Sequence, residues 1–345
     1  MERATAGLLA ALVARGHDVH LASPGHGTQI AGVTVHPLRL PRLPAPARAL
    51  WLTVVARRAV AAGRWDVVQS HERTLCQQVY RAGEGCHQAY LASGGSRGRR
   101  GLRHRVVLAL EARVFARTPR IVAIARRGKQ EIEGFYGVSP ERVRVIYNGV
   151  DLERFHPANV TRHRAVARQE AGVGAREHVL LFVGSGFERK GLGTAIEALT
   201  QVGDARLVVI GRGDERRYRA LAERLGVASR VRWLGLRRDV ERWYAAADVL
   251  VLPARYEPFG NVHLEALASG LAVVTTTAAG GSEVIEEGKN GAVVAPGDPA
   301  ALSGAVATLR GLDPAGRAEA ARAAAEPFTY ARQAVEFEAL YREIP

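Results

Sequence analysis

The sequence predicts an α/β protein with two doubly wound domains of Rossmann type. Three observations support this fold class: the length of 345 residues, short β-branched runs that alternate with amphipathic stretches, and a break in this pattern near residue 157. A chain of this length exceeds what one hydrophobic core usually serves. Continuous apolar strands separated by helical segments are typical of parallel sheets covered on both faces.

The second half of the chain, residues 158–345, shows the alternation most clearly. Its apolar runs lie at residues 179–185, 205–211, 231–235, 248–254, 271–276 and 291–296. We expect a doubly wound domain here, with the last helix, over about 327–343, as a candidate to pack back onto the first domain. Ligands of such folds bind at the carboxyl ends of the strands, so we expect a cleft between the two domains.

The first half, residues 1–157, repeats the pattern less regularly. We expect strands at 18–23, 33–38, 66–71, 120–125 and 143–149, and helices near 46–62, 101–116 and 126–136. Asn148-Gly149 and Pro157 interrupt the pattern, which places the domain boundary near residue 157.

Composition excludes several classes of protein. The hydrophobic fraction is 47%, and no run of eighteen apolar residues occurs, which argues against disorder and against a membrane span. The two cysteines, Cys76 and Cys86, form no C-x-x-C pair, and no secretory signal is recognisable. A disulfide scaffold and a zinc site are therefore not expected, and a cytoplasmic location fits best.

The positive charge is concentrated in the first half. The chain has a net charge of +14; residues 1–157 contain 24 Lys and Arg against 11 Asp and Glu, whereas residues 158–345 contain 24 against 23. Such asymmetry indicates that one domain faces a polyanion, either nucleic acid or an anionic membrane. Nucleic acid is disfavoured, because the cations are not interleaved with aromatic residues and no nucleic-acid motif is present.

A glycine-rich turn follows the strand at 179–185, in the segment "VGSGFERKGLGTAIEAL". Gly184 and Gly186 allow a ligand to approach the backbone, and Arg189 and Lys190 add two cations near a helix start that favours anions. The turn lacks the third glycine of a dinucleotide fingerprint and the G-K-[ST] of a P-loop. A plain strand-to-helix turn with solvated cations is the alternative.

The segment "YEPFGNVHLEALASG" at 256–270 carries two carboxylates near a helix start. Asn261 and Glu265 lie four residues apart on one helix face. Carboxylates accept hydrogen bonds from vicinal hydroxyls, so Glu265 suits a ribose and Glu257 suits a sugar ring. The alternative is that Glu257 is a turn residue and Glu265 an exposed helix residue.

These two segments, with "VIYNGVD" at the domain junction, closely resemble the retaining glycosyltransferases of family four, which have the GT-B fold. The resemblance covers nearly the whole chain. Within the family, "VGSGFERKGLGTAIEAL" and "VYRAGEGCHQAYL" (79–91) look most like the lipopolysaccharide core α-1,3-glucosyltransferases, which transfer glucose from UDP-glucose to inner-core heptose. Other nucleotide sugars for surface polysaccharide are the alternative within this class.

The resemblance implies roles for these residues. Arg189 and Lys190 neutralise the departing diphosphate, so neither a divalent metal nor a cofactor is expected. Glu265 holds the ribose, and Glu257 with the backbone of 259–262 holds the donor sugar. The implied donor-binding residues are Gly184, Gly186, Arg212, Arg237, Phe259, Gly260, Asn261, Val262 and Glu265, and the implied catalytic residues are Arg189, Lys190, Glu257, Glu84 and His87.

Retention in the family is explained by front-face attack, in which the departing phosphate oxygen takes the acceptor's proton. The resemblance places an acidic residue at Glu84 in contact with sugar, and His87 is the other candidate from that loop. This chain has Glu84 where Asp is commoner and Cys86 where an aliphatic residue is common. A structural role is the alternative for His87.

A basic amphipathic stretch covers residues 96–120 and favours an anionic membrane surface. It predicts peripheral association with the inner face of the cytoplasmic membrane, near a lipopolysaccharide acceptor. The alternative is a domain helix with a core-facing apolar side and solvated arginines. The candidate membrane contacts are Arg97, Arg99, Arg100, Arg103 and Arg105, beside the apolar series Val106, Val107, Leu110, Val114 and Phe115.

The start of the chain departs from the family pattern. Family members begin with a strand and a glycine-rich loop, whereas Met1 here already stands at the start of the first helix. We therefore expect the first strand of the N-terminal domain to be missing, through a start codon assigned too late. The alternative is a catalytically deficient relative that acts as a binding or scaffolding subunit at the membrane.

Overall fold

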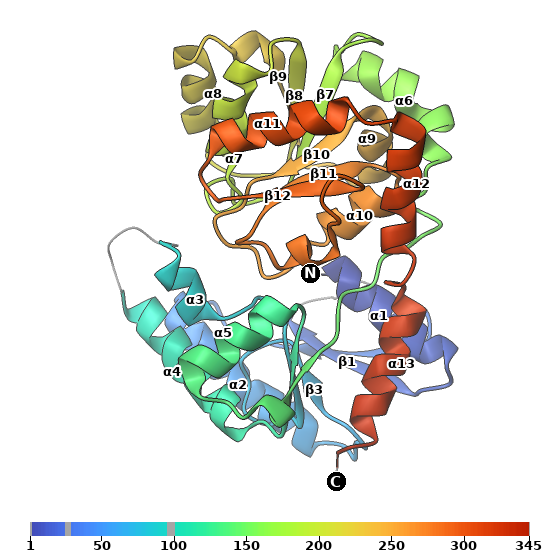
Figure 1. Cartoon of the computed structure of the whole chain (residues 1–345). Helices are drawn as coiled ribbons and strands as arrows, with labels where there is room; N and C mark the ends of the chain where they lie inside the picture. Colours follow the sequence, from blue (N-terminus) through green and yellow to red (C-terminus); the bar gives the residue numbers. More distant parts are fainter. Residues whose placement is uncertain (1, 25–28, 95–100, 345) are drawn as a thin grey trace. The chain divides into compact units, whose positions relative to one another are not determined.

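The computed structural model describes residues 2–24, 29–94 and 101–344, which form two compact units (Figure 1). Unit 1 consists of Met1–Gly149 and Tyr330–Pro345, and unit 2 of Val150–Thr329. The division falls at Gly149, earlier than the expected boundary near residue 157, because Val150 already pairs with Thr329 in unit 2. The helix α13 (Tyr330–Tyr341) belongs to unit 1, where it packs against α1 (Glu2–Ala14).

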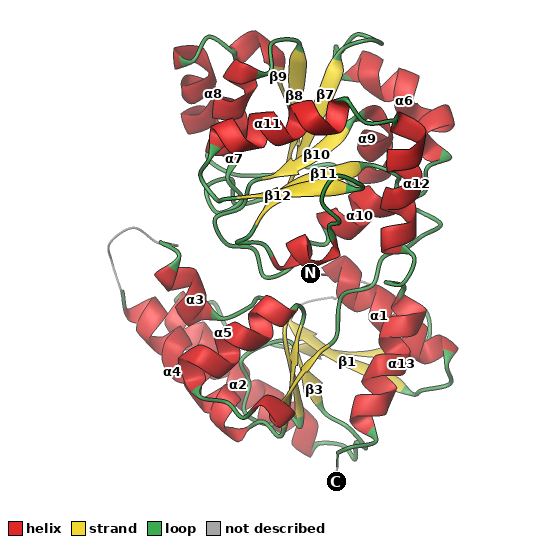
Figure 2. Ribbon diagram, viewed as in Figure 1, coloured by secondary structure: helices red, strands yellow, loops and turns green. Residues whose placement is uncertain are grey.

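Unit 2 contains one parallel sheet of six strands in the order β12-β11-β10-β7-β8-β9 (Figure 2). All six strands expected from the apolar runs are confirmed. They are β7 (His178–Val183), β8 (Ala205–Ile210), β9 (Val231–Gly235), β10 (Val249–Leu252), β11 (Ala272–Thr276) and β12 (Gly291–Val294).

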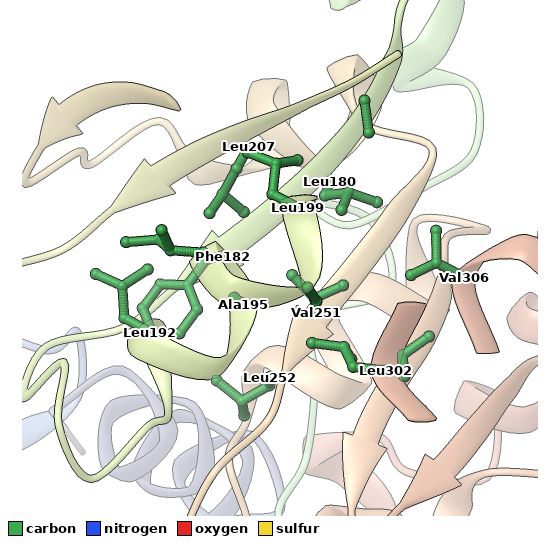
Figure 3. Close-up of a cluster of buried hydrophobic side chains, with 14 of the residues drawn as sticks. Leu180, Phe182, Leu192, Ala195, Leu199, Leu207, Val251, Leu252, Leu302 and Val306 are labelled. Atoms are coloured by element: carbon green, nitrogen blue, oxygen red, sulfur yellow. The ribbon is translucent and has the colours of Figure 1, made fainter. Parts of the chain in front are cut away.

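Helices cover both faces of the unit 2 sheet. Alternate strand residues, such as Leu180 and Phe182 of β7, pack with Leu192 and Leu302 of α7 and α11 on one face (Figure 3). The intervening Leu181 lines a small cavity with residues of α6 and α9 on the other face. The helices are α6 (Asn159–Glu170), α7 (Leu192–Ala198), α8 (Glu215–Arg224), α9 (Val240–Ala246), α10 (Val262–Ala268), α11 (Pro299–Arg310) and α12 (Pro314–Ala325). Because both faces are buried, the strands are continuously apolar.

Unit 1 contains two separate parallel sheets among its described residues, β1-β2 and β3-β4-β5-β6. The expected strands and helices are confirmed, but β4 was not anticipated from the sequence. The strands are β1 (Val19–Pro24), β2 (Val33–Leu38), β3 (Gln69–Ser70), β4 (Val79–Ala82), β5 (Arg120–Ala123) and β6 (Val143–Val145). The remaining helices are α2 (Ala45–Ala61), α3 (His87–Ala92), α4 (Leu102–Arg117) and α5 (Arg126–Tyr136).

Side chains link the two sheets of unit 1. One buried cluster joins Val19 of β1 and Val79 of β4 to Leu8 of α1 and Phe337 of α13. Burial of such side chains contributes roughly 1.5–3 kcal/mol each. The C-terminal helix is therefore part of the core that holds both sheets.

Candidate functional site

The turn after β7 brings two cations to the carboxyl end of the unit 2 sheet. Gly184 and Gly186 have φ angles of 154° and 79°, which favour glycine. A Cβ on Gly184 would lie 2.2 Å from Cδ of Lys190, so the glycine leaves room for the lysine side chain. The N–H of Gly186 donates to the carbonyl of Arg212 at 2.9 Å, which joins this turn to the one after β8.

Glu257 accepts hydrogen bonds from both cations. Its Oε2 lies 2.6 Å from Nζ of Lys190 and 2.9 Å from Nη1 of Arg189. Lys190 and Glu257 are only 8% and 7% exposed. Burial would raise the pKa of Glu257, but the charges of Lys190 and Arg189 outweigh it and lower that pKa to about 2. The cluster therefore holds one carboxylate and two cations, an excess of one positive charge.

Sheet topology explains how residues 67 positions apart meet. Strand β10 pairs with β7, so the segments that follow these two strands lie side by side. The N–H of Arg255 donates to the carbonyl of Arg189 at 2.8 Å. The N–H of Glu257 donates to the carbonyl of Ala278 at 3.1 Å, which ties the segment to the loop after β11. Glu257 is thus fixed by backbone contacts on both sides.

A buried histidine supports the turn at Gly260. Nδ1 of His263 lies 2.6 Å from the carbonyl oxygen of Gly260, and Nε2 lies 2.8 Å from Oγ1 of Thr275. Burial lowers the pKa of His263 to about 4, so the ring is neutral at physiological pH. Gly260 has a φ of 81°, and the N–H of Gly281 donates to the carbonyl of the fully buried Phe259. The backbone before α10 is therefore held in one conformation.

Glu265 is oriented by a tyrosine from α9. The hydroxyl of Tyr244 donates to Oε2 of Glu265 at 2.7 Å, and Tyr244 is 1% exposed. The N–H of Glu265 donates to the carbonyl of Asn261 at 3.0 Å, as expected for the first turn of α10. Glu265 is half-buried, so it is neither free in solvent nor part of the core.

In unit 1, Glu84 lies in the loop between β4 and α3, and His87 is the first residue of α3. Nη1 of Arg73 donates to Oε2 of Glu84 at 2.9 Å, and the Glu84 side chain is 44% exposed. Nε2 of His87 lies 3.0 Å from Nδ1 of His104, and the two rings stack. Burial lowers the pKa of His87. The loop and the start of α3 therefore present a carboxylate and an imidazole.

A buried carboxylate, Glu111 of α4, anchors that loop. Glu111 is 0% exposed and accepts from Nη2 of Arg73 at 3.1 Å and from the hydroxyl of Tyr136 at 2.6 Å. Both of its oxygens also lie 2.9 Å from the backbone N–H of His87. Glu111 thus fixes the start of α3 and, through Arg73, the position of Glu84.

Profiles of known protein families match both halves of the chain. The profile described as Glycosyltransferase Family 4 matches residues 1–154, and the profile described as Glycosyl transferases group 1 matches residues 177–310. A probable transglycosylase of Burkholderia thailandensis is 33% identical over 264 residues, which cover 76% of this chain and 68% of that protein.

The chain belongs to glycosyltransferase family 4.

Other members of family 4 agree with this assignment. The lipopolysaccharide glucosyltransferase WaaG of Escherichia coli is 34% identical over 200 residues, which span 56% of this chain and only 54% of that protein. The crystal structure of WaaG, a glycosyltransferase involved in lipopolysaccharide biosynthesis, matches with a TM-score of 0.84 and 26% identity over 99% of this chain and 95% of that one. The fold is therefore GT-B.

The structure does not bring every predicted site residue of this family 4 chain together. Arg237 points into an ion-pair cluster, with Nη2 2.7 Å from Glu170 and Nε 3.1 Å from Asp239, and it stacks on Trp243. Arg212 is exposed beside the glycine-rich turn. Of the candidate membrane contacts, Arg97, Arg99 and Arg100 lie outside the described residues, whereas Arg103 and Arg105 are exposed on α4.

Three supporting residues were not anticipated from the sequence. His263, Tyr244 and Glu111 each contact a predicted site segment through a buried polar group. His263 follows Gly260 by only three residues, so a turn at that glycine was a usable local signal for this contact. Tyr244 and Glu111 come from other helices, so local spacing gave no signal for them. No helix among the described residues is long and apolar enough to cross a bilayer.

Replacing Glu111 by Ala is expected to destabilise unit 1 by about 3–5 kcal/mol, because Arg73, Tyr136 and the N–H of His87 lose a shared buried partner. Glu111→Gln keeps an acceptor oxygen and should lose less. Thermal unfolding measures both changes. Glu141, which is exposed on the same unit, provides the control, since Glu141→Ala should leave the unfolding temperature unchanged. Equal stability of Glu111→Ala and the native protein would contradict this account.

Stability of unit 2 is expected to fall as the pH decreases from about 6.5 to about 4. The folded-state pKa of His263 is about 4, below its ordinary 6.5, so the unfolded chain binds more protons in this window. The stabilisation by neutral His263 is fully present above pH 6.5. Below about pH 4 the free energy of unfolding has lost this contribution, which amounts to about 3 kcal/mol. Urea unfolding at pH 7.5 and pH 5 should show a smaller pH effect in His263→Gln. An unchanged pH effect in that variant would assign the loss to other groups.

Proposed function

We propose that this chain is a retaining glycosyltransferase that transfers a hexose, glucose from UDP-glucose, to an inner-core heptose of lipopolysaccharide. The observation that carries the proposal is the cluster of Arg189 with the buried Lys190 and Glu257 at the carboxyl ends of β7 and β10. It combines cations suited to a diphosphate with a carboxylate suited to sugar hydroxyls. WaaG and a lipopolysaccharide core biosynthesis glycosyltransferase of Rhizobium meliloti, 38% identical over 143 residues, support the acceptor class.

In this proposal Lys190 and Arg189 hold the diphosphate and Glu257 holds the sugar. The backbone from Phe259 to Val262 contacts the same sugar. Glu265, oriented by Tyr244, accepts from the ribose hydroxyls. Because Glu257 pairs with both cations and fixes their positions, the cations need no rearrangement when charge develops on the leaving phosphate. Preorganised donors of this kind are the largest contributors to many enzymatic rates.

The chemical step requires no strong protein base. The bond between the sugar C1 and the phosphate oxygen breaks, and C1 bonds to the acceptor oxygen on the same face. The acceptor proton passes to the departing phosphate oxygen. The protein cations take the place of a divalent metal. We assign Glu84 and His87 to the acceptor hydroxyls, with Arg73 and Glu111 holding their loop.

Transfer of radiolabelled glucose tests the proposal. The purified protein is incubated with UDP-glucose and lipopolysaccharide that ends at the inner-core heptose, in the presence of a metal chelator. We expect a product whose new linkage has the donor's anomeric configuration by NMR. Transfer from GDP-mannose or UDP-galactose instead would overturn the donor assignment. Binding of UDP-glucose with no transfer to any acceptor would support the scaffold alternative.

We also propose that the enzyme works at an anionic membrane surface, where a lipopolysaccharide precursor is found. Arg103 and Arg105 are exposed on α4 and available for this contact. The apolar side of α4 is not available, because Leu110, Val114 and Phe115 are buried in the core of unit 1. The α4 helix therefore supplies charge to this contact, and any insertion into the bilayer requires another element.

A further inference from the structure

The helix α2 is long and apolar, but none of its residues is fully buried. It spans 17 residues, and none of them falls in the buried class. Leu50, Trp51 and Val54 are 48%, 39% and 41% exposed. A surface helix of a globular protein normally buries one apolar stripe and exposes a polar one. On α2 a second apolar stripe faces solvent.

The exposed apolar residues form one patch with arginines at both ends. Trp51 and Val54 are three residues apart, and Leu50 and Val54 are four apart, so the three side chains are neighbours on the helix surface. Arg48 lies one turn before this patch, and Arg57 and Arg58 lie one turn after it. All three arginines are exposed. The long stems of such arginines can lie along an apolar surface while their charges reach a polar layer.

The surrounding sequence contains no negative charge. Between Val19 and Trp65 there is no Asp or Glu, and the segment contains the six arginines Arg39, Arg42, Arg48, Arg57, Arg58 and Arg64. None of these six pairs with a carboxylate of a described residue. The neighbouring α4 packs against α2, and its one acidic residue, Glu111, is fully buried. This face of unit 1 therefore presents arginines without an exposed carboxylate from either helix.

We infer that α2, with the preceding segment 39–44, is an interfacial helix that lies in the surface of an anionic bilayer and inserts Leu50, Trp51 and Val54. An apolar patch with a tryptophan, flanked by basic residues, is the composition of helices that bind this interface. The absence of acidic residues matches a negative lipid surface, and each arginine near it contributes about a fivefold gain in binding. The partner is the lipid surface itself, and this binding is independent of sugar transfer.

Vesicle binding of the full chain, without nucleotide sugar or acceptor, tests this inference. We expect binding to vesicles that contain phosphatidylglycerol and little binding to phosphatidylcholine alone. The triple variant Leu50→Gln/Trp51→Gln/Val54→Gln should bind more than tenfold more weakly. The matched control is Val160→Gln/Val166→Gln on α6 of unit 2, where two apolar residues are 40% and 58% exposed, and its binding should not change.

Fluorescence quenching by brominated lipids reports insertion directly. Trp51 is 39% exposed, whereas Trp243 is 1% exposed. We therefore expect brominated lipids to quench the tryptophan fluorescence of the native protein. The substitution Trp51→Phe should remove most of this quenching while binding to the vesicles persists.

Binding to the vesicles without fluorescence quenching would overturn insertion of the helix. Loss of binding only in Arg103→Gln/Arg105→Gln would assign the surface to α4. A dimer in solution that the triple variant dissociates would make the patch a protein interface. Because none of these readouts involves transfer, failure of the glucosyltransferase proposal would be seen separately.

Discussion

Lys190→Ala is expected to lower the rate of sugar transfer by about 10²–10³-fold, the usual loss when one preorganised charge is removed from a transition state. Lys190 is the more buried of the two cations, with a side chain 10% exposed against 32% for Arg189. A charge in a less hydrated position interacts more strongly with a leaving phosphate. Arg189→Ala should therefore reduce the rate less than Lys190→Ala does.

The measurement is kcat and KM for the donor, with thermal unfolding to confirm that each variant is folded. The loss should fall mainly on kcat, because the charge to be stabilised develops as the bond breaks. Lys289 serves as the control, since its side chain is 69% exposed and pairs with Glu286 on the surface. A folded Lys190→Ala enzyme within threefold of the native rate would remove this lysine from the proposed mechanism.

Gly191→Ala is expected to destabilise unit 2 by several kcal/mol, among the largest effects of any single methyl group in the chain. Gly191 precedes α7 with a φ of 76°, which L-residues adopt only with strain. A Cβ at this position would lie 1.8 Å from the carbonyl oxygen of Pro253, so the backbone must move. Movement here displaces the adjacent Lys190, and we expect both stability and transfer to fall.

A second glycine, two residues further on, provides a stringent control. Gly193 lies inside α7, and a Cβ there would make ordinary contacts of 3.7 and 3.8 Å with Tyr218 and Leu221. Because alanine is the better helix former, Gly193→Ala should be neutral or should stabilise by up to about 1 kcal/mol. Urea unfolding that shows equal stability for the two variants would contradict the steric explanation.

The fold of unit 2 was predictable from sequence because its strands are buried on both faces. Runs such as "VLLFVGS" are typical of strands in a parallel sheet covered on both faces, and every residue of β7 is buried. Strand β4 was not predicted, since it has four residues and one of them is an arginine. Arg81 is 2% exposed, and its Nη2 donates to the side-chain oxygen of Asn148. A buried cation with a distant partner gives no apolar signal.

The part of the candidate site that lies in local sequence motifs was predictable from the sequence. Arg189, Lys190 and Glu257 follow strands whose carboxyl ends meet in a parallel sheet, so their proximity follows from topology. The ion-pair cluster of Arg237 depends on Glu170, 67 residues away on α6. Such long-range pairings, like those of Glu111, leave no periodic trace in the sequence, and a residue type alone does not indicate them.

The return of α13 to unit 1 has a consequence for how the protein folds during synthesis. Unit 2 is one continuous segment, Val150–Thr329, and can form its sheet as soon as that segment has left the ribosome. Unit 1 needs Ala334, Phe337 and Leu340 to close its core, and these residues are made after the whole of unit 2. The larger part of unit 1 is therefore synthesised before unit 2 but completed after it, so its apolar surface, together with α2, stays exposed to chaperones or lipid until α13 has been made.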